Sequence, residues 1–148
     1  MEEGRFREIL QFAIDKEVEA FQFYTQASQQ ARYSGGKELF MSLAKEEEGH
    51  RKLLENLNME KIAQKRIEQV PDLHISDYMV EVALTPDLSY ADILRIAMKR
   101  EEKSLKLYTD MKESHTDEAL KKLFEFLASE EAKHKLRLEK IYDDEILR

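Results

Sequence analysis

Along most of the chain, apolar residues recur at the three- and four-residue intervals of an amphipathic helix. This periodicity runs to about Val70, is interrupted between Pro71 and Pro86, and resumes at about Ser89. Turn signals divide each half once more, at "YSGGK" and at "ESHTDEA". The pattern predicts four helices, at residues 5–32, 36–69, 89–113 and 116–146.

The ends of these helices and the lengths of their connections predict an arrangement. Gly35 and Gly36 can end the first helix and turn the chain into the second, and "SYADIL" resembles a capping box that begins at Ser89. Ser114 or Thr116 can cap the last helix. Short first and last connections favour two antiparallel helical hairpins, and the long middle connection favours a crossover. We therefore predict an all-α four-helix bundle of ferritin-like connectivity.

The two halves also resemble each other. With a shift of 84 positions, residues 9–29 align with 93–113 and residues 37–57 with 121–141, and 16 of these 42 pairs are identical. We infer an internal duplication and predict a pseudo-twofold axis within one domain, 1–148. The predicted repeats and crossover are residues 5–69, 89–146 and 70–88, and the identical pairs include Glu17/Glu101, Tyr24/Tyr108, Glu47/Glu131 and His50/His134.

Each helix has an apolar seam that becomes polar near its middle. A buried ionised carboxylate is costly unless an opposite charge neutralises it. With neutral imidazoles, four carboxylates balance two divalent cations. The pattern therefore predicts two metal ions about 3.5–4 Å apart. The six polar seam residues, the predicted ligands, are Glu17, Glu47, His50, Glu101, Glu131 and His134.

Periodicity alone leaves a second seam open in the helix predicted at 36–69, through Glu46 and Leu53. The equivalent seam in the last helix would pass through Arg137, whereas the chosen one passes through Leu138. We therefore keep Glu47 on the seam. Taken singly, any of these glutamates also fits a solvated helix face, and the duplication is what favours a site. The neighbouring glutamates expected to be exposed are Glu46, Glu48, Glu102 and Glu130.

The predicted ligands favour particular metals. Oxygen-rich ligation with two imidazoles suits iron or manganese, whereas zinc more often takes three histidines or cysteines. We expect two iron ions, with manganese or mixed iron and zinc as alternatives. Two metals with open positions can bind peroxide or dioxygen, and the small residues Ala20 and Ser104 leave room there. Tyr24 and Tyr108 are either plain core aromatics or hydrogen-bond donors to ligand carboxylates.

Composition narrows the class of protein. The net charge of −7 disfavours nucleic-acid binding. No run of 18 apolar residues is present and the first residues lack the apolar region of a signal peptide, so we expect a cytoplasmic protein without a membrane span. The absence of Cys excludes disulfides, zinc–thiolate sites and iron–sulfur centres from these 148 residues.

Four motifs carry a resemblance that covers nearly the whole chain: "AIDKEVEAFQFY", "AMKREEKSLKLY", "EEGH" and "EAKH". They are similar to those of the ferritin-like diiron-carboxylate superfamily, most closely the rubrerythrin-type domain. The resemblance implies bridging roles for Glu47 and Glu131. It also implies more terminal binding by Glu17 and Glu101, with His50 and His134 each capping one metal.

The resemblance further implies an oxidoreductase that reduces peroxide or dioxygen with electrons from an external redox protein. A homodimer is one expected state of the chain. Two features depart from that family. Rubrerythrins often carry an extra Glu, linked to iron movement in peroxide chemistry, where this chain has Ser104. They also often carry a cysteine-rich rubredoxin domain, and this sequence has no Cys. The alternative functions are a ferroxidase or iron-handling protein and a metal-free helical interaction module.

Overall fold

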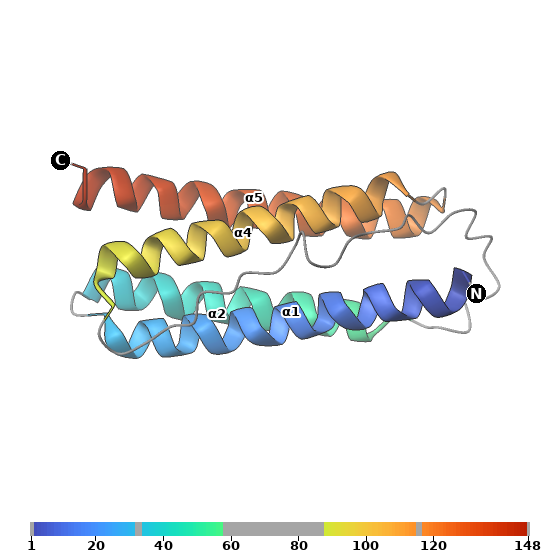
Figure 1. Ribbon diagram of the computed structural model, residues 1–148, viewed down its shortest axis with the longest axis horizontal. Helices are drawn as coiled ribbons and strands as arrows, with labels where there is room; N and C mark the ends of the chain where they lie inside the picture. The colour runs from blue at the N-terminus through green and yellow to red at the C-terminus, as the bar shows by residue number, and fades with distance from the viewer. Residues whose placement is uncertain (1, 32–33, 58–87, 115–116, 148) are drawn as a thin grey trace.

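The computed structural model describes residues 2–31, 34–57, 88–114 and 117–147. In these ranges the chain forms helices and no strands, which confirms the all-α prediction. The helices are α1 (Glu2–Gln30), α2 (Ser34–Glu55), α4 (Tyr90–Glu113) and α5 (Glu118–Glu145), as labelled in Figure 1.

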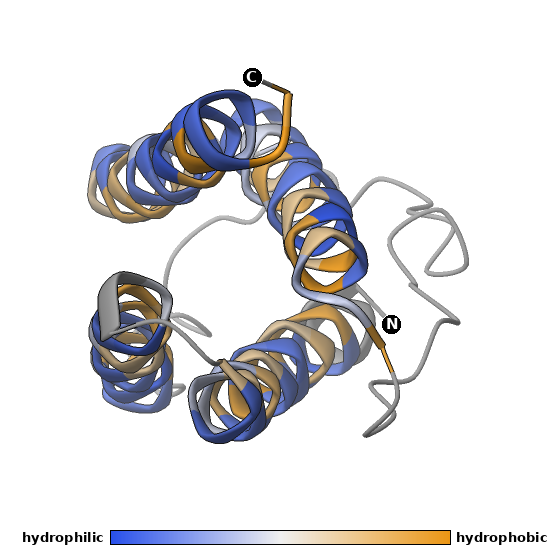
Figure 2. Ribbon diagram, turned by 90° about the vertical axis from the view of Figure 1, so that its left-hand side faces the viewer, coloured by the Kyte–Doolittle hydropathy of each residue, from blue (hydrophilic) through white to orange (hydrophobic). Residues whose placement is uncertain are grey.

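The helices pack as two hairpins side by side. α1 lies antiparallel to α2, and α4 lies antiparallel to α5, so that each hairpin has an extensive internal interface (Figure 1). α2 ends and α4 begins at opposite ends of the bundle, the arrangement that a long crossover connects. Seen end on, hydrophobic residues face the bundle axis and hydrophilic residues face outward (Figure 2). The predicted ferritin-like bundle is thereby confirmed.

The polar layer divides the core into two apolar clusters. One contains Leu54, Tyr108 and Phe124, and the other contains Tyr24, Phe40 and Leu138. Each cluster combines residues from both hairpins, so burial of apolar surface holds the hairpins together. Buried apolar layers on both sides also keep bulk water away from the polar layer between them.

The observed helix bounds differ from the predicted ones by at most three residues, except at the end of α2. α2 ends at Glu55 and residues 56–57 form a turn, so the predicted continuous helix over 36–69 is wrong at residues 56 and 57. Gly35 and Gly36 lie in the first turn of α2, not between the helices. Packing explains Gly36, because a Cβ atom there would lie 2.9 Å from the hydroxyl of Tyr90. Residues 58–69 and 70–87 of the predicted helix and crossover lie outside the described residues.

One predicted cap is confirmed and another is wrong. The Ser89 hydroxyl accepts a hydrogen bond from the backbone N–H of Asp92, 3.1 Å away, as the capping box predicts. The N-cap of α5 is Asp117, whose carboxylate accepts from the backbone N–H of Leu120 at 2.9 Å. Ser114 instead ends α4, and Thr116 lies outside the described residues. A carboxylate at this position also interacts favourably with the helix dipole.

Candidate metal centre

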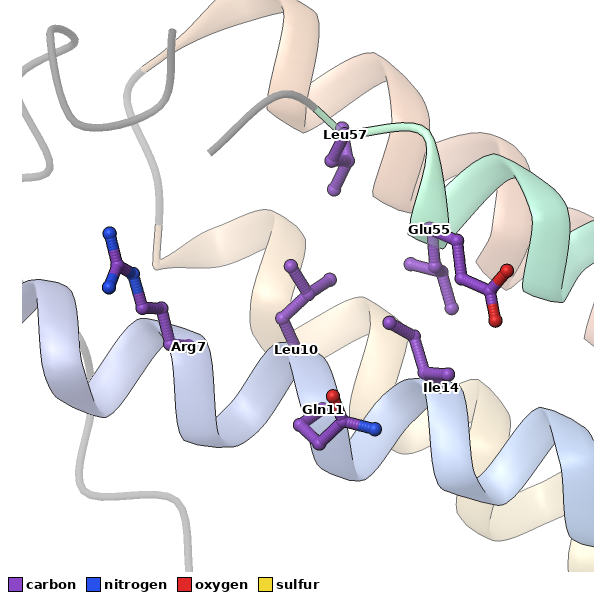
Figure 3. A pocket seen from close by; sticks show the side chains of 7 residues that line it. Arg7, Leu10, Gln11, Ile14, Glu55 and Leu57 are labelled. Carbon is purple, nitrogen blue, oxygen red and sulfur yellow. The ribbon is translucent and has the colours of Figure 1, made fainter. Parts of the chain in front are cut away.

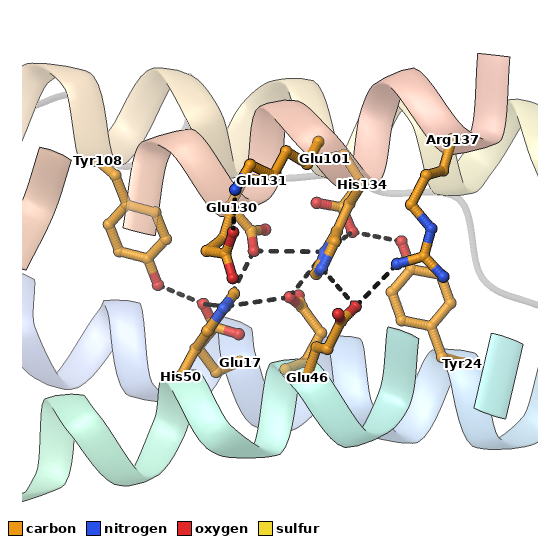
Figure 4. A network of polar contacts seen from close by, with 12 residues as sticks. Glu17, Tyr24, Glu46, His50, Glu101, Tyr108, Glu130, Glu131, His134 and Arg137 are labelled. Atoms are coloured by element: carbon orange, nitrogen blue, oxygen red, sulfur yellow. Dashed lines mark hydrogen bonds and ion pairs between the residues drawn. The ribbon is translucent and has the colours of Figure 1, made fainter. Parts of the chain in front are cut away.

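The six predicted ligands all lie in the polar layer at the middle of the bundle. α1 and α4 contribute Glu17 and Glu101, and the Glu-x-x-His pairs come from α2 and α5 (Figure 4). None of the six is more than 4% exposed. The chosen seam is correct, because Leu54 is fully buried whereas Leu53 is 42% exposed.

The layer contains two overlapping groups of possible ligands. One group consists of Glu17, Glu47, His50 and Glu131, and the other of Glu47, Glu101, Glu131 and His134. Within each group, one ligand atom from every residue lies within 4.8 Å of the others. Glu47 and Glu131 belong to both groups, which is the placement that bridging carboxylates require.

Both imidazoles present Nδ1 to the carboxylates. Nδ1 of His50 lies 3.0 Å from Glu131 and 3.2 Å from Glu47. Nδ1 of His134 lies 3.2 Å from Glu47 and 3.4 Å from Glu101. The two rings are stacked with centroids 5.7 Å apart, so one imidazole stands beside each group. This equivalence agrees with the pseudo-twofold relation between the halves.

The two tyrosines connect the hairpins through the outer glutamates. The hydroxyl of Tyr24 donates a 2.5 Å hydrogen bond to Glu101, and the hydroxyl of Tyr108 donates one of the same length to Glu17 (Figure 4). These bonds are related by the 84-residue shift. A phenol that donates to a ligand carboxylate fixes its orientation and supports its negative charge. Of the two interpretations of these tyrosines, the structure shows the hydrogen-bonded one.

Burial and mutual repulsion raise the pKa of three of the four carboxyl groups. Burial, reinforced by the charge of Glu47, raises the pKa of Glu17 from 4.5 to about 8. Burial and Glu47 also raise the pKa of Glu101. Burial and the neighbouring carboxylates hold the pKa of Glu131 well above its usual range. For Glu47, burial acts in the same direction, but contacts with His134 and His50 leave its pKa below the usual value.

The imidazoles shift in the opposite sense from ordinary buried histidines. Burial alone would lower the pKa of both His50 and His134, but the nearby carboxylates raise it to about 10. Without metal, protons therefore take the place of cations in this layer. A metal ion must displace them, because a histidine ligand binds as the neutral imidazole and a glutamate ligand as the carboxylate.

The hydrogen-bonding groups of the layer test whether a metal fits. Seven buried atoms make no hydrogen bond among the described residues, although buried polar atoms are nearly always paired. A cation would coordinate such unpaired oxygens and Nδ1 atoms, so the donor set fits two divalent ions. The seven atoms are Glu17 Oε2, Glu47 Oε1, His50 Nδ1, Glu101 Oε2, both carboxylate oxygens of Glu131, and His134 Nδ1.

Of the glutamates expected to be exposed, only Glu102 is so, and Glu46, Glu48 and Glu130 are half-buried. Glu46 is the notable case, because its Oε2 lies 2.9 Å from Nε2 of His134 and 3.0 Å from a guanidinium nitrogen of Arg137. This contact of Glu46 with a predicted ligand was not expected from the sequence. One feature of the sequence could have indicated it: Arg137 follows His134 by three residues, and the equivalent position of the other repeat is Leu53.

A separate pocket lies at the end of the bundle near the start of α1 (Figure 3). Its lining includes Arg7, Leu10 and Ile14 of α1 together with Leu57, and none of the six predicted ligands lines it. It therefore has no part in the polar layer. No helix in the described part of the chain is long and apolar enough to cross a membrane.

The chain is similar to two solved structures. A hypothetical protein from Pyrococcus furiosus is 28% identical, with a TM-score of 0.73 over 92% of this chain and 87% of that one. A putative ferritin-like diiron-carboxylate protein from Thermotoga maritima is 22% identical, with a TM-score of 0.72 over 90% of this chain and 91% of that one, which shows a shared fold. No curated protein shows a significant match to this chain.

A family model described as rubrerythrin matches residues 8–142. The match includes all four described helices except the ends of α1 and α5. It also includes every residue of the Glu- and His-rich polar layer. The chain therefore belongs to the rubrerythrin family.

Proposed function

We propose that this protein is a non-haem diiron carboxylate oxidoreductase that reduces hydrogen peroxide or dioxygen with electrons from an external donor. The observation that carries the proposal is the layer of six buried ligands whose inward-facing atoms make no hydrogen bonds to protein. Without metal, these atoms would be compensated only by protons and by contacts between imidazoles and carboxylates, which is a costly way to bury four carboxyl groups. A metal centre accounts for all of these atoms.

The six predicted ligands would bind the two ions in different ways. Glu47 and Glu131 belong to both ligand groups and would contact both ions, Glu17 and His50 would hold one ion, and Glu101 and His134 would hold the other. Tyr24 and Tyr108 orient the two outer carboxylates. When bound, two reduced iron ions supply the two electrons that convert one peroxide and two protons to two molecules of water. Manganese, or mixed iron and zinc, are the alternative occupants.

Repeated turnover needs electrons from outside this chain. The 148 residues contain no Cys, so they cannot form an iron–sulfur or rubredoxin-type centre. They also lack the glycine fingerprint of a nicotinamide-binding fold. We infer that a small redox protein re-reduces the centre in the cytoplasm.

A stopped-flow experiment tests the reaction. Protein loaded anaerobically with Fe(II) is mixed with excess peroxide and followed by absorbance. We expect the reduced form to consume about one peroxide per pair of metal ions and then stop in the oxidised state, because the two metals hold two electrons. Addition of a small redox protein with its reductase should restore turnover.

Two other results would contradict this function. Sustained loss of peroxide with evolution of oxygen would indicate disproportionation, and no oxidation within minutes would exclude peroxide as the oxidant. Ser104 is the first position to change in the second case, because it is half-buried one turn after Glu101 and replaces the extra Glu of similar proteins. Restored oxidation in Ser104→Glu would identify that position as the cause. Glu102→Gln, on the exposed face of α4, is the matched control.

A further inference from the structure

The two predicted histidine ligands differ at the ring nitrogen that points away from the carboxylates. Nε2 of His134 lies 2.9 Å from Oε2 of Glu46. Nε2 of His50 has no hydrogen bond or ion pair with any residue in the described ranges, although both rings present Nδ1 to the polar layer in the same way. The two histidines are therefore equivalent at Nδ1, inside the polar layer, but differ at Nε2, on its outer side.

The polar contact at His134 has three members. A guanidinium nitrogen of Arg137 donates to Oε2 of Glu46 at 3.0 Å, and the other donates to the Ser42 hydroxyl at 3.3 Å (Figure 4). Arg137 thus holds Glu46 against the outer edge of the imidazole. These two contacts of the guanidinium fix the position of the Glu46 carboxylate beside the ring.

The 84-residue shift shows what replaces these three residues beside His50. Glu46 corresponds to Glu130, which pairs with Lys133 at 3.3 Å instead of with the histidine. Arg137 corresponds to Leu53, and Ser42 corresponds to Phe126. The Phe126 ring meets the His50 ring edge to face, with centroids 6.3 Å apart. The duplicated site has therefore exchanged a charged contact for an apolar one.

This difference has a chemical consequence for metal binding. A histidine that binds metal through Nδ1 carries its proton on Nε2. An acceptor for that proton fixes the tautomer and the ring orientation and makes the ligand nitrogen more basic, and loss of such an acceptor typically lowers metal affinity about 10–100-fold. Nε2 of His134 has a carboxylate oxygen 2.9 Å away that can take this part, whereas an aromatic ring lies beside His50.

We propose that Glu46 is a positioning residue for His134, so that the metal position beside His134 is the tighter one and the position beside His50 loses its metal first. The inference rests on the proposed dimetal centre but not on the proposed reaction. It assigns unequal affinities to two positions whose inner ligands are equivalent.

Stepwise loading with Co(II) tests the inference, followed by calorimetry and by visible absorption. The wild-type protein should bind two ions per chain in two steps, and crystals loaded with one equivalent should show the anomalous peak beside His134. Glu46→Ala should weaken the tighter step about 10–100-fold. Glu46→Gln should be affected less, because the amide oxygen still accepts the ring proton. Glu130→Ala is the matched control and should leave both steps unchanged.

A second variant moves the contact to the other repeat. Leu53→Arg combined with Phe126→Ser supplies Glu130 with the two partners that Glu46 has, and it should tighten the weaker step. Two equal steps in the wild type, or equal effects of Glu46→Ala and Glu130→Ala, would overturn the inference and leave the dimetal centre standing. Failure of the wild-type protein to bind Co(II) at all would overturn the dimetal centre as well.

Discussion

Replacement of Glu17 by Gln tests whether the buried carboxylates serve metal binding instead of stability. Glu17 is 2% exposed, and burial together with Glu47 raises its pKa from 4.5 to about 8. A carboxyl group with a raised folded-state pKa supports folding fully below pH 4.5, and this support is lost as the pH rises toward 8. Gln has the same shape and can still accept the hydrogen bond from Tyr108.

The size of the effect follows from the distance between the pH and the unfolded pKa. At pH 7 that distance is about 7 − 4.5 = 2.5 pH units at about 1.4 kcal/mol each, so protonation of Glu17 costs about 3 kcal/mol. At pH 5 the cost is below about 1 kcal/mol. The amide loses attraction to His50, which offsets part of the gain. We therefore expect metal-free Glu17→Gln to exceed wild type in stability by about 1–3 kcal/mol at pH 7 and by less than about 1 kcal/mol at pH 5.

Urea denaturation followed by circular dichroism measures this difference at both pH values, with a chelator present. Glu102→Gln, an exposed glutamate on α4, should show no such dependence on pH. When the proteins are loaded with Fe(II) under anaerobic conditions, the order of stability should reverse, because Glu17→Gln lacks a ligand and gains less from metal.

The result that refutes this reasoning is a metal-free Glu17→Gln protein that is less stable than wild type at pH 7. Glu17 would then stabilise the fold itself. The same difference at pH 5 and pH 7 would show that Glu17 stays ionised in the folded state, contrary to the raised pKa.

Three further predictions concern other residues. Glu131→Ala should lose metal from both positions, because Glu131 belongs to both ligand groups, and full occupancy by elemental analysis would contradict that. Tyr24→Phe and Tyr108→Phe should each weaken Fe(II) binding about 10-fold in anaerobic titrations, since each removes a hydrogen bond to an outer carboxylate; unchanged affinity would mean that the phenols only fill space. Leu54→Ala should destabilise the protein by about 2–5 kcal/mol in urea, whereas Leu53→Ala should change stability by less than about 0.5 kcal/mol; similar losses would contradict the assigned seam.

The sequence predicted the polar layer because the layer follows from periodicity. Residues three or four apart share a helix face, so a seam fixed by Leu54 or Leu138 also fixes where Glu47 and His134 lie. The duplication added an independent constraint. Polar residues interrupt the apolar seam at equivalent positions in both repeats, and a solvent-exposed helix face would not be expected to show this. The bundle and the six residues of the polar layer could therefore be predicted from the pattern.

The features that were missed depend on contacts across the bundle. Glu46 is off the seam, and only the structure shows that Arg137 of α5 holds it beside His134. In the sequence, Gly36 predicts a turn, whereas in the structure it is a helical residue whose missing side chain allows Tyr90 to pack closely against it. The early end of α2 is likewise not visible in the pattern, because its apolar spacing continues past Glu55. Each case is decided by tertiary packing, which outweighs local propensity.

An anomalous difference map at the iron absorption edge, from crystals grown after anaerobic loading with Fe(II), tests the central claim most directly. The account predicts two peaks per chain inside the polar layer, one beside Nδ1 of His50 and one beside Nδ1 of His134, with Glu47 and Glu131 contacting both. A layer without any peak, in protein whose six ligands are intact, would contradict a dimetal centre and favour a helical module without metal.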